Sequence, residues 1–155
     1  MAYRSCGETS RRMRPANLSA YLFMVAGLGF LLPFISLSCS GQHLATVTGV
    51  QLVRGSEMSF HQTPFDARAA FALAMCVLGT LLSRTIAGTD RRIPALVGVA
   101  GTLALLAFKT TLDDEVLRHG HGVIRVQYEY GYYLSLGALV SATAVGFAAR
   151  RARDL

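Results

Sequence analysis

Charged residues are scarce in this sequence, and they are missing where a transport function would need them. They make up 15% of the 155 residues, against 52% for apolar residues, whereas about 25% of an average soluble domain is charged. No Asp, Glu, Lys, Arg or His lies in the central part of any long apolar run. Ionisable side chains at membrane depth mark proton relays, ion pathways and substrate sites. Their absence argues against a pump or an ion-coupled transporter.

Sequence signatures of catalysis and of cofactor binding are also missing. There is no nucleophile elbow, no zinc-binding helix with paired histidines and no glycine-rich phosphate loop. No histidine lies inside an apolar run, where it could ligate haem or chlorophyll. The cysteines Cys6, Cys39 and Cys76 are expected in three different places, so no internal disulfide is predicted. We therefore expect neither an enzyme nor a cofactor, although bound lipid, or a pigment held with a partner, is compatible with such a chain.

Four apolar runs dominate the sequence. They cover residues 18–37, 67–86, 93–112 and 130–149. At about 1.5 Å per residue, a helix of about 20 residues spans the roughly 30 Å hydrocarbon core of a bilayer. The chain is therefore predicted to be one all-α membrane domain, residues 1–155, built as a bundle of four transmembrane helices.

The positions of the cationic residues predict the orientation of these helices. Lys and Arg accumulate on the cytoplasmic side of membrane proteins. With the tail 1–17 and the turn 87–92 inside, the inner cations are Arg4, Arg11, Arg12, Arg14, Arg84, Arg91, Arg92, Arg150, Arg151 and Arg153. The outer cations, in or beside the periplasmic loops 38–66 and 113–129, are then Arg54, Arg68, Lys109, Arg118 and Arg125. We predict a multi-pass protein of the bacterial inner membrane with both termini in the cytoplasm.

Tyrosines gather at the outer end of the fourth run. Tyr128, Tyr130, Tyr132 and Tyr133 precede about twenty uncharged residues, which end at an arginine cluster. Because tyrosine rings favour the headgroup region, these four residues are predicted to form a belt at the outer membrane interface.

Small residues recur at intervals of four in three of the runs. The predicted helix-packing residues are Ala70, Ala74, Ala100, Ala104, Ala138, Ala142 and Gly146. Such stripes let helices approach closely where lipid offers no hydrophobic drive for association. The abundance of alanine in the chain is the alternative explanation.

The outer loops contain strand-like segments. The stretch 43–53 is rich in Val and Thr and leads into Arg54-Gly55, which indicates a strand, a turn and a second strand. The stretch 123–130 alternates between polar and apolar residues. Since isolated strands leave their backbone groups unpaired, we expect the two loops to pair as a small β-sheet outside the bundle.

The first run also has features of a lipoprotein signal. A positive tail and an apolar stretch precede Leu37-Ser38-Cys39, as they would before cleavage at a lipidated cysteine. However, Ser36 stands where such a signal favours leucine. We therefore expect this helix to remain attached.

All four histidines fall in the predicted outer loops, at His43, His61, His119 and His121. The pair His119 and His121 follows Asp113, Asp114 and Glu115, and imidazole with carboxylate is a donor set that suits zinc or copper. A solvated polar loop would have the same composition. The pair is a speculative metal site.

The segment 32–55, LPFISLSCSGQHLATVTGVQLVRG, contains a Pro-Phe, a Ser-Cys-x-Gly-Gln and a Thr-Gly-x-x-Leu element. In these elements it resembles the first outer loop of small, uncharacterised four-helix membrane proteins of bacteria. The overall plan, with a strand-bearing first outer loop and a shorter second one, is similar to the claudin architecture. The claudin signature is missing, since the chain has no Trp and no cysteine pair in that loop. The resemblance therefore does not imply a paracellular barrier.

These features predict a non-catalytic accessory subunit of a larger respiratory, photosynthetic or transport complex. Its partners would be other integral membrane subunits and lipid, without a small-molecule substrate. Nucleic acid is not expected, because no basic run is interleaved with aromatic residues. One alternative is a stand-alone sensor or metal-binding protein of the outer face, and another is a homo-oligomeric pore lined by Ser and Thr.

Overall fold

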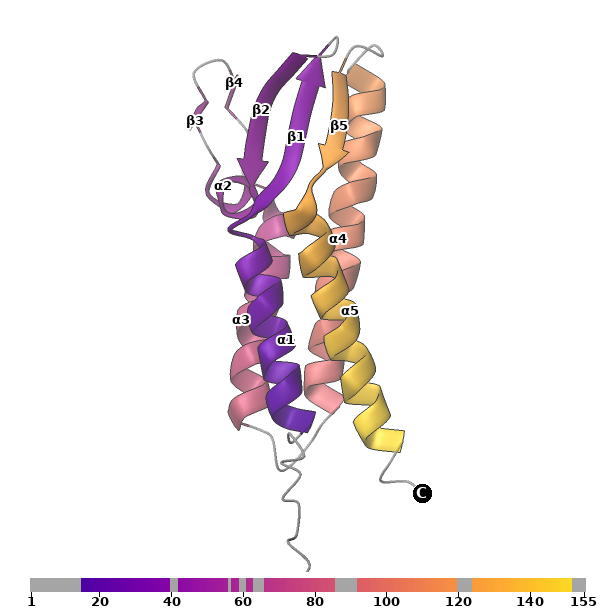
Figure 1. Ribbon diagram of the computed structural model, residues 1–155. Helices are drawn as coiled ribbons and strands as arrows, with labels where there is room; N and C mark the ends of the chain where they lie inside the picture. The colour runs from indigo at the N-terminus through magenta and orange to yellow at the C-terminus, as the bar shows by residue number, and fades with distance from the viewer. Residues whose placement is uncertain are drawn as a thin grey trace, which may run out of the picture.

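The computed structural model describes residues 15–39, 42–55, 57–58, 61–62, 66–85, 92–119 and 124–151. The protein is mostly helical, with a small sheet at one end of a helix bundle (Figure 1). The helices are α1 (Pro15–Gly29), α2 (Gly49–Arg54), α3 (Ala67–Thr85), α4 (Arg92–His119) and α5 (Tyr130–Arg151). The strands are β1 (Pro33–Cys39), β2 (Gln42–Thr48), β3 (Glu57–Met58), β4 (His61–Gln62) and β5 (Ile124–Tyr128).

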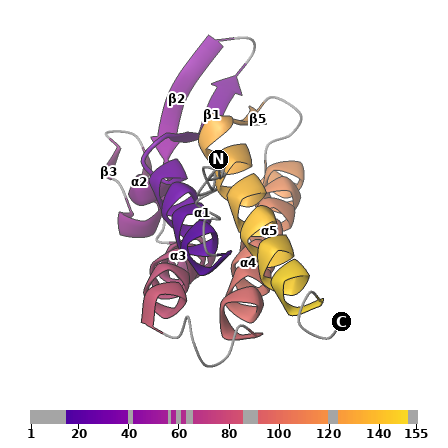
Figure 2. The same ribbon diagram turned by 60° about the horizontal axis from the view of Figure 1, so that its bottom comes forward.

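Four of the helices form a closed bundle. Helix α1 packs against α3 and α5, and α4 packs against the same two helices (Figure 2). Helices α3, α4 and α5 are long and apolar enough to cross a membrane, whereas α1 is shorter. The start of α1 and the end of α5 lie at the same end of the bundle, away from the sheet (Figure 1).

The outer surface of the bundle is apolar. The exposed side chains include Leu18, Met24, Val25, Leu28, Phe71, Val77, Leu78, Leu81, Ile93, Leu96, Leu103, Leu106, Leu134, Val140 and Phe147. Soluble monomers rarely expose apolar surface on this scale. Together with the three long helices, this surface is the one expected of a membrane-embedded protein.

The first apolar run does not form one helix, and the expected helix over 18–37 is wrong in its second half. Helix α1 ends at Gly29, and β1 begins at Pro33. Between them, the amides of residues 30–32 each donate to the carbonyl three residues earlier, as in a tightened last turn. Proline cannot donate a backbone hydrogen bond to a continuing helix. The run is therefore divided into a helix and a strand of similar hydrophobicity.

Strand β1 is the centre of the main sheet, whose order is β2-β1-β5 with antiparallel pairing. Ile35 faces Val47 of β2 on one side and Tyr128 of β5 on the other. The expected sheet is present, but β2 and β5 do not pair with each other, since β1 lies between them. Ser38 and Cys39, the first residues of the outer loop 38–66, belong to β1 and pair with β5. Residues 49–54 form α2 rather than a second strand, because Thr48 and Gln51 make a reciprocal capping box at its N-terminus.

Helix α4 continues seven residues beyond its expected end at 112. Its 28 residues reach His119, and at about 1.5 Å per residue they extend about 42 Å. The helix rises beside β5 (Figure 1). Asp113, Asp114 and Glu115 therefore lie on a helix, and part of the expected outer loop is regular structure.

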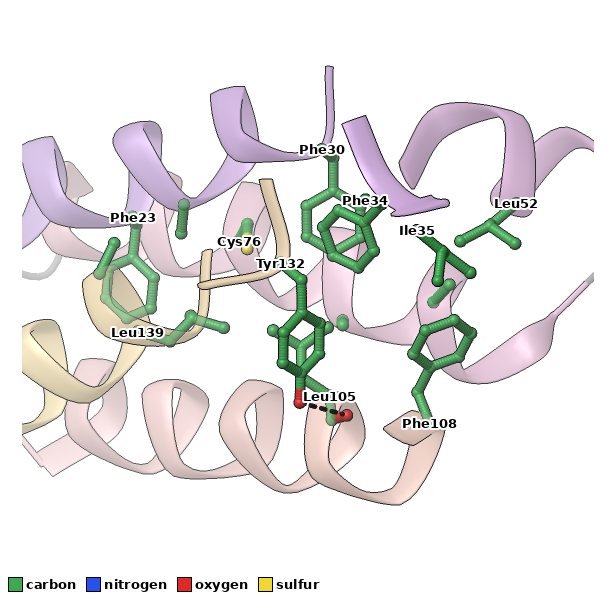
Figure 3. Close-up of a cluster of buried hydrophobic side chains, with 14 of the residues drawn as sticks. Phe23, Phe30, Phe34, Ile35, Leu52, Cys76, Leu105, Phe108, Tyr132 and Leu139 are labelled. Carbon is green, nitrogen blue, oxygen red and sulfur yellow. Dashed lines mark hydrogen bonds between the residues drawn. The ribbon is translucent and has the colours of Figure 1, made fainter. Parts of the chain in front are cut away.

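The junction between the sheet and the bundle is filled by aromatic side chains. Phe30, Phe34, Phe108 and Tyr132 are fully or almost fully buried (Figure 3). The Phe34 ring centroid lies 4.9 Å from that of Phe30, 6.3 Å from that of Phe108 and 5.6 Å from that of Tyr132. Because Phe34 belongs to β1 while its neighbours belong to the bundle or its last turn, this cluster holds the sheet on the helices.

Candidate functional site at the sheet end of the bundle

Tyr128 connects the edge strand β5 to helix α4. Its hydroxyl donates to Oδ1 of Asp113 at 2.7 Å and lies 3.3 Å from the carbonyl oxygen of Lys109. The ammonium of Lys109 lies 5.2 Å from the centroid of the Tyr128 ring, within the range of a cation–π contact. This connection requires the extra turns of α4 beyond residue 112.

The environment of Tyr128 keeps its phenol protonated. Burial raises the pKa of Tyr128 above its ordinary value of 10.0, and the hydrogen bond to the Asp113 carboxylate raises it further. The phenol therefore remains a hydrogen-bond donor up to a higher pH than an exposed tyrosine would.

A second carboxylate, that of Glu129, joins β1 to the start of α5. The buried hydroxyl of Ser36 donates to Oε1 of Glu129 at 2.8 Å. The Glu129 amide donates to the carbonyl of Phe34, and the Glu129 carbonyl accepts from the amide of Tyr132. A negative side chain just before a helix N-terminus also interacts favourably with the helix dipole.

Beside these contacts lies an open hollow of about 480 Å³. It is lined by Val126, Gln127, Tyr128, Glu129, Tyr130 and Tyr133. In the described part of the chain, its two nearby carboxylates, of Asp113 and Glu129, already accept hydrogen bonds from hydroxyl groups. The arrangement therefore fits a clamp that joins the sheet to two helices better than it fits an acid–base pair.

The predicted tyrosine belt divides into two pairs. Tyr130 and Tyr133 are exposed, at 81% and 57% of their surface, as an interfacial position requires. Tyr132 is only 1% exposed, and its hydroxyl donates to the carbonyl of Leu105 at 3.4 Å (Figure 3). Placing Tyr132 in the belt was therefore wrong, because the first turn of α5 directs this ring into the core. Tyr128 is half-buried against α4.

The predicted helix-packing residues are more deeply buried on α5 than on α3. Ala138 and Ala142 are buried, and a Cβ added at Gly146 would lie 2.9 Å from that of Ala95. On α4, Ala100 and Ala104 are half-buried. On α3, Ala70 is half-buried and Ala74 is exposed. The buried stripe of α3 is instead Ala69, Ala72, Cys76, Gly79 and Ser83.

Several close helix contacts depend on glycines that the four-residue spacing did not identify. A Cβ at Gly131 would lie 2.6 Å from the Pro33 carbonyl oxygen and 2.7 Å from that of Gly29. A Cβ at Gly98 would clash with Thr143 on α5. Since each partner is distant in sequence, the presence of glycine itself was the only signal.

The histidines stay untested as metal ligands. His43, His61 and His119 belong to β2, β4 and the end of α4, but their side chains, and the whole of His121, lie outside the described residues. Among the residues that are described, no group of three or more His, Cys, Asp or Glu side chains could hold a metal ion. The metal site at His119 and His121 remains a prediction.

Comparison with known proteins identifies no relative of this chain. No protein-family model matches the chain, and no curated protein and no solved structure is detectably similar to it. Any function must therefore be inferred from the residues and their arrangement.

Proposed function

We propose that this protein is a non-catalytic structural subunit of a larger bacterial inner-membrane complex, of a respiratory, photosynthetic or transport kind. In this proposal α1, α3, α4 and α5 all cross the membrane, both termini are cytoplasmic, and the sheet covers neighbouring subunits on the outer side. Two features support the proposal: the packed interior of the bundle and a stripe of exposed small residues on α5.

The described interior of the bundle is filled by closely packed side chains, most of them apolar. Its buried residues are aromatic, aliphatic or small, apart from three serines: Ser19, Ser83 and Ser135. Ser19 and Ser83 lie within hydrogen-bond distance of each other between α1 and α3, and Ser135 donates to the carbonyl of Ala26 on α1. Such bonds fasten helices to one another. They provide no path for a substrate or an ion.

The observation that carries the proposal is a second small-residue stripe on α5, turned away from the bundle. Gly137, Ser141, Ala144 and Ala148 are all exposed, and a Cβ added at Gly137 would meet no atom within 4 Å. Beside this stripe, α4 and α5 form an apolar groove of about 290 Å³. Small residues on a lipid-facing surface allow another transmembrane helix to approach closely.

Ser141 supplies a polar group for such a helix. The hydroxyls of Thr102 and Thr143, which flank the groove, donate to carbonyls of their own helices. In the described part of the chain, the Ser141 hydroxyl has no hydrogen-bond partner. An unpaired hydroxyl facing lipid is unfavourable. A helix of another subunit with a polar side chain at this depth would satisfy it.

Replacement of Gly137 by leucine tests this interface. The leucine would fill the close-approach position on α5, so the partner subunit should be lost when the complex is purified from its native membrane in mild detergent. The matched control is Ala74→Leu, which adds a leucine to an exposed position on α3. This variant should retain the partner.

Neither variant is expected to melt at a lower temperature than the wild type, because neither position is buried. A wild-type protein that purifies as a monomer without co-migrating chains would contradict the proposal. Loss of the partner from both variants alike would contradict the assignment of the α5 face.

A further inference from the structure

On α4 and α5 the exposed apolar surface is shorter along the helix axis than the hydrocarbon core of a typical bilayer. On α4 the exposed large apolar side chains within the bundle run from Ile93 to Leu106, and on α5 they run from Tyr130 to Phe147. At about 1.5 Å per residue, the stretch covers about 20 Å on α4 and about 26 Å on α5. The hydrocarbon core of a typical bilayer is about 30 Å thick.

Charged residues limit the apolar length on α3 and α4. Exposed Arg68 and Arg84 stand near the two ends of α3, sixteen positions apart, which corresponds to about 24 Å. On α4, seventeen positions separate Arg92 from Lys109, or about 26 Å. Neither distance reaches the usual core thickness.

The sheet imposes an independent limit on the outer side. Helix α1 has 15 residues before the turn that leads into β1, a length of about 22 Å. The backbone groups at the edges of an open sheet cannot remain unpaired in hydrocarbon, so the sheet must stand outside it. The close approach of Gly131 to Gly29 and Pro33 places the first turn of α5 at the same level.

From these lengths we infer that the protein is matched to a hydrocarbon layer of about 25 Å, and that a thicker bilayer must become thinner around it. Long cationic side chains could extend the apolar length by reaching outward. The Lys109 ammonium already does so, since it lies over the Tyr128 ring of β5. Reaching outward moves a charge by a few ångströms, but it does not move the sheet.

The test uses the full chain in phosphatidylcholine vesicles with acyl chains of about 14, 18 and 22 carbons. The midpoint of thermal unfolding should be highest in the shortest lipid and at least about 5 °C lower in the longest. A midpoint that is highest in the longest lipid, or that does not depend on lipid length, would overturn the inference.

The inference rests on the proposed four-span placement. Flotation of the vesicles distinguishes a failure of that placement from a failure of the matched thickness. Protein that fails to float with the vesicles contradicts the placement. Protein that floats but is most stable in long-chain lipid contradicts only the matched thickness.

Arg84→Leu extends the apolar surface of α3 at its inner end. The acyl-chain length that gives the highest unfolding midpoint, the optimum, should therefore be longer for this variant than for the wild type. Arg125→Leu removes an exposed charge from β5, outside the bundle, and should leave the optimum unchanged. If both variants keep the wild-type optimum, Arg84 does not limit the apolar length. If Arg84→Leu does not fold, the wild-type series decides the question alone.

Discussion

At the scale of single residues, Gly131 is the position where one added carbon should matter most. A methyl group there would be forced against the backbone carbonyls of Gly29, Leu32 and Pro33, which cannot rotate away as a side chain could. We expect Gly131→Ala to lower the free energy of unfolding by about 1–3 kcal/mol. Denaturant titration of the detergent-solubilised protein would measure the change.

Gly137 provides the control for this prediction, because it lies on the same helix with open space around it. Gly137→Ala should leave the protein unchanged or stabilise it by about 0.5–1 kcal/mol, since alanine favours a helix more than glycine does. Equal destabilisation by both substitutions would show that the close approach at Gly131 does not determine the effect.

Which residues would make the close contacts could be predicted only in part. The spacing of small residues identified Ala138, Ala142 and Gly146, where three residues lie on one face. On α3 small residues stand at so many positions that spacing could not choose between Ala70 and Ala69. The orientation of that helix is set by its neighbours, and this information is not local to its sequence.

At the scale of elements, the bond between Tyr128 and Asp113 links β5 to α4 and should make stability depend on pH. Because burial raises the Tyr128 pKa in the folded protein, the unfolded chain loses this proton first as the pH rises above about 10. The unfolded state then binds fewer protons than the folded state, so stability falls with increasing pH.

Tyr128→Phe should therefore show a shallower loss of stability than the wild type when unfolding is followed from about pH 8 to 11. Without the hydrogen bond, this variant should also be less stable at neutral pH by about 1–2 kcal/mol. Tyr130→Phe, which changes an exposed ring, should retain the wild-type slope. A slope that is unchanged in Tyr128→Phe would refute the buried, hydrogen-bonded state of this phenol.

At the boundary between α1 and β1, hydrophobicity alone does not distinguish a membrane helix from a buried strand. Residues 18–37 are apolar almost throughout, and both a membrane helix and a buried central strand require such a run. Phe34, Ile35 and Ser36 are all buried, so β1 does not present the polar face that would have identified it. Pro33 was the local signal of the boundary, since β1 begins there and the helix has already ended at Gly29.

At the scale of the whole molecule, the sequence predicted a helical bundle with strands at one end, and the structure confirms this general plan. Three helices meet the length and composition needed to cross a membrane. The pairing of the strands was not predictable from the loops alone, because the central strand comes from a segment that resembles a membrane helix. The four crossings and their direction stay predictions.

The most direct test of the account is the sidedness of the two ends of the bundle. Single cysteines at Thr46 in β2 and at Thr85 at the end of α3 would replace exposed residues at opposite ends, in a chain whose three native cysteines have been removed. With a membrane-impermeant maleimide on intact spheroplasts, the cysteine at 46 should be labelled at once, and the cysteine at 85 only after the membrane is opened. Labelling of both positions before opening, or of position 85 alone, would contradict a bundle that crosses the membrane with its sheet outside.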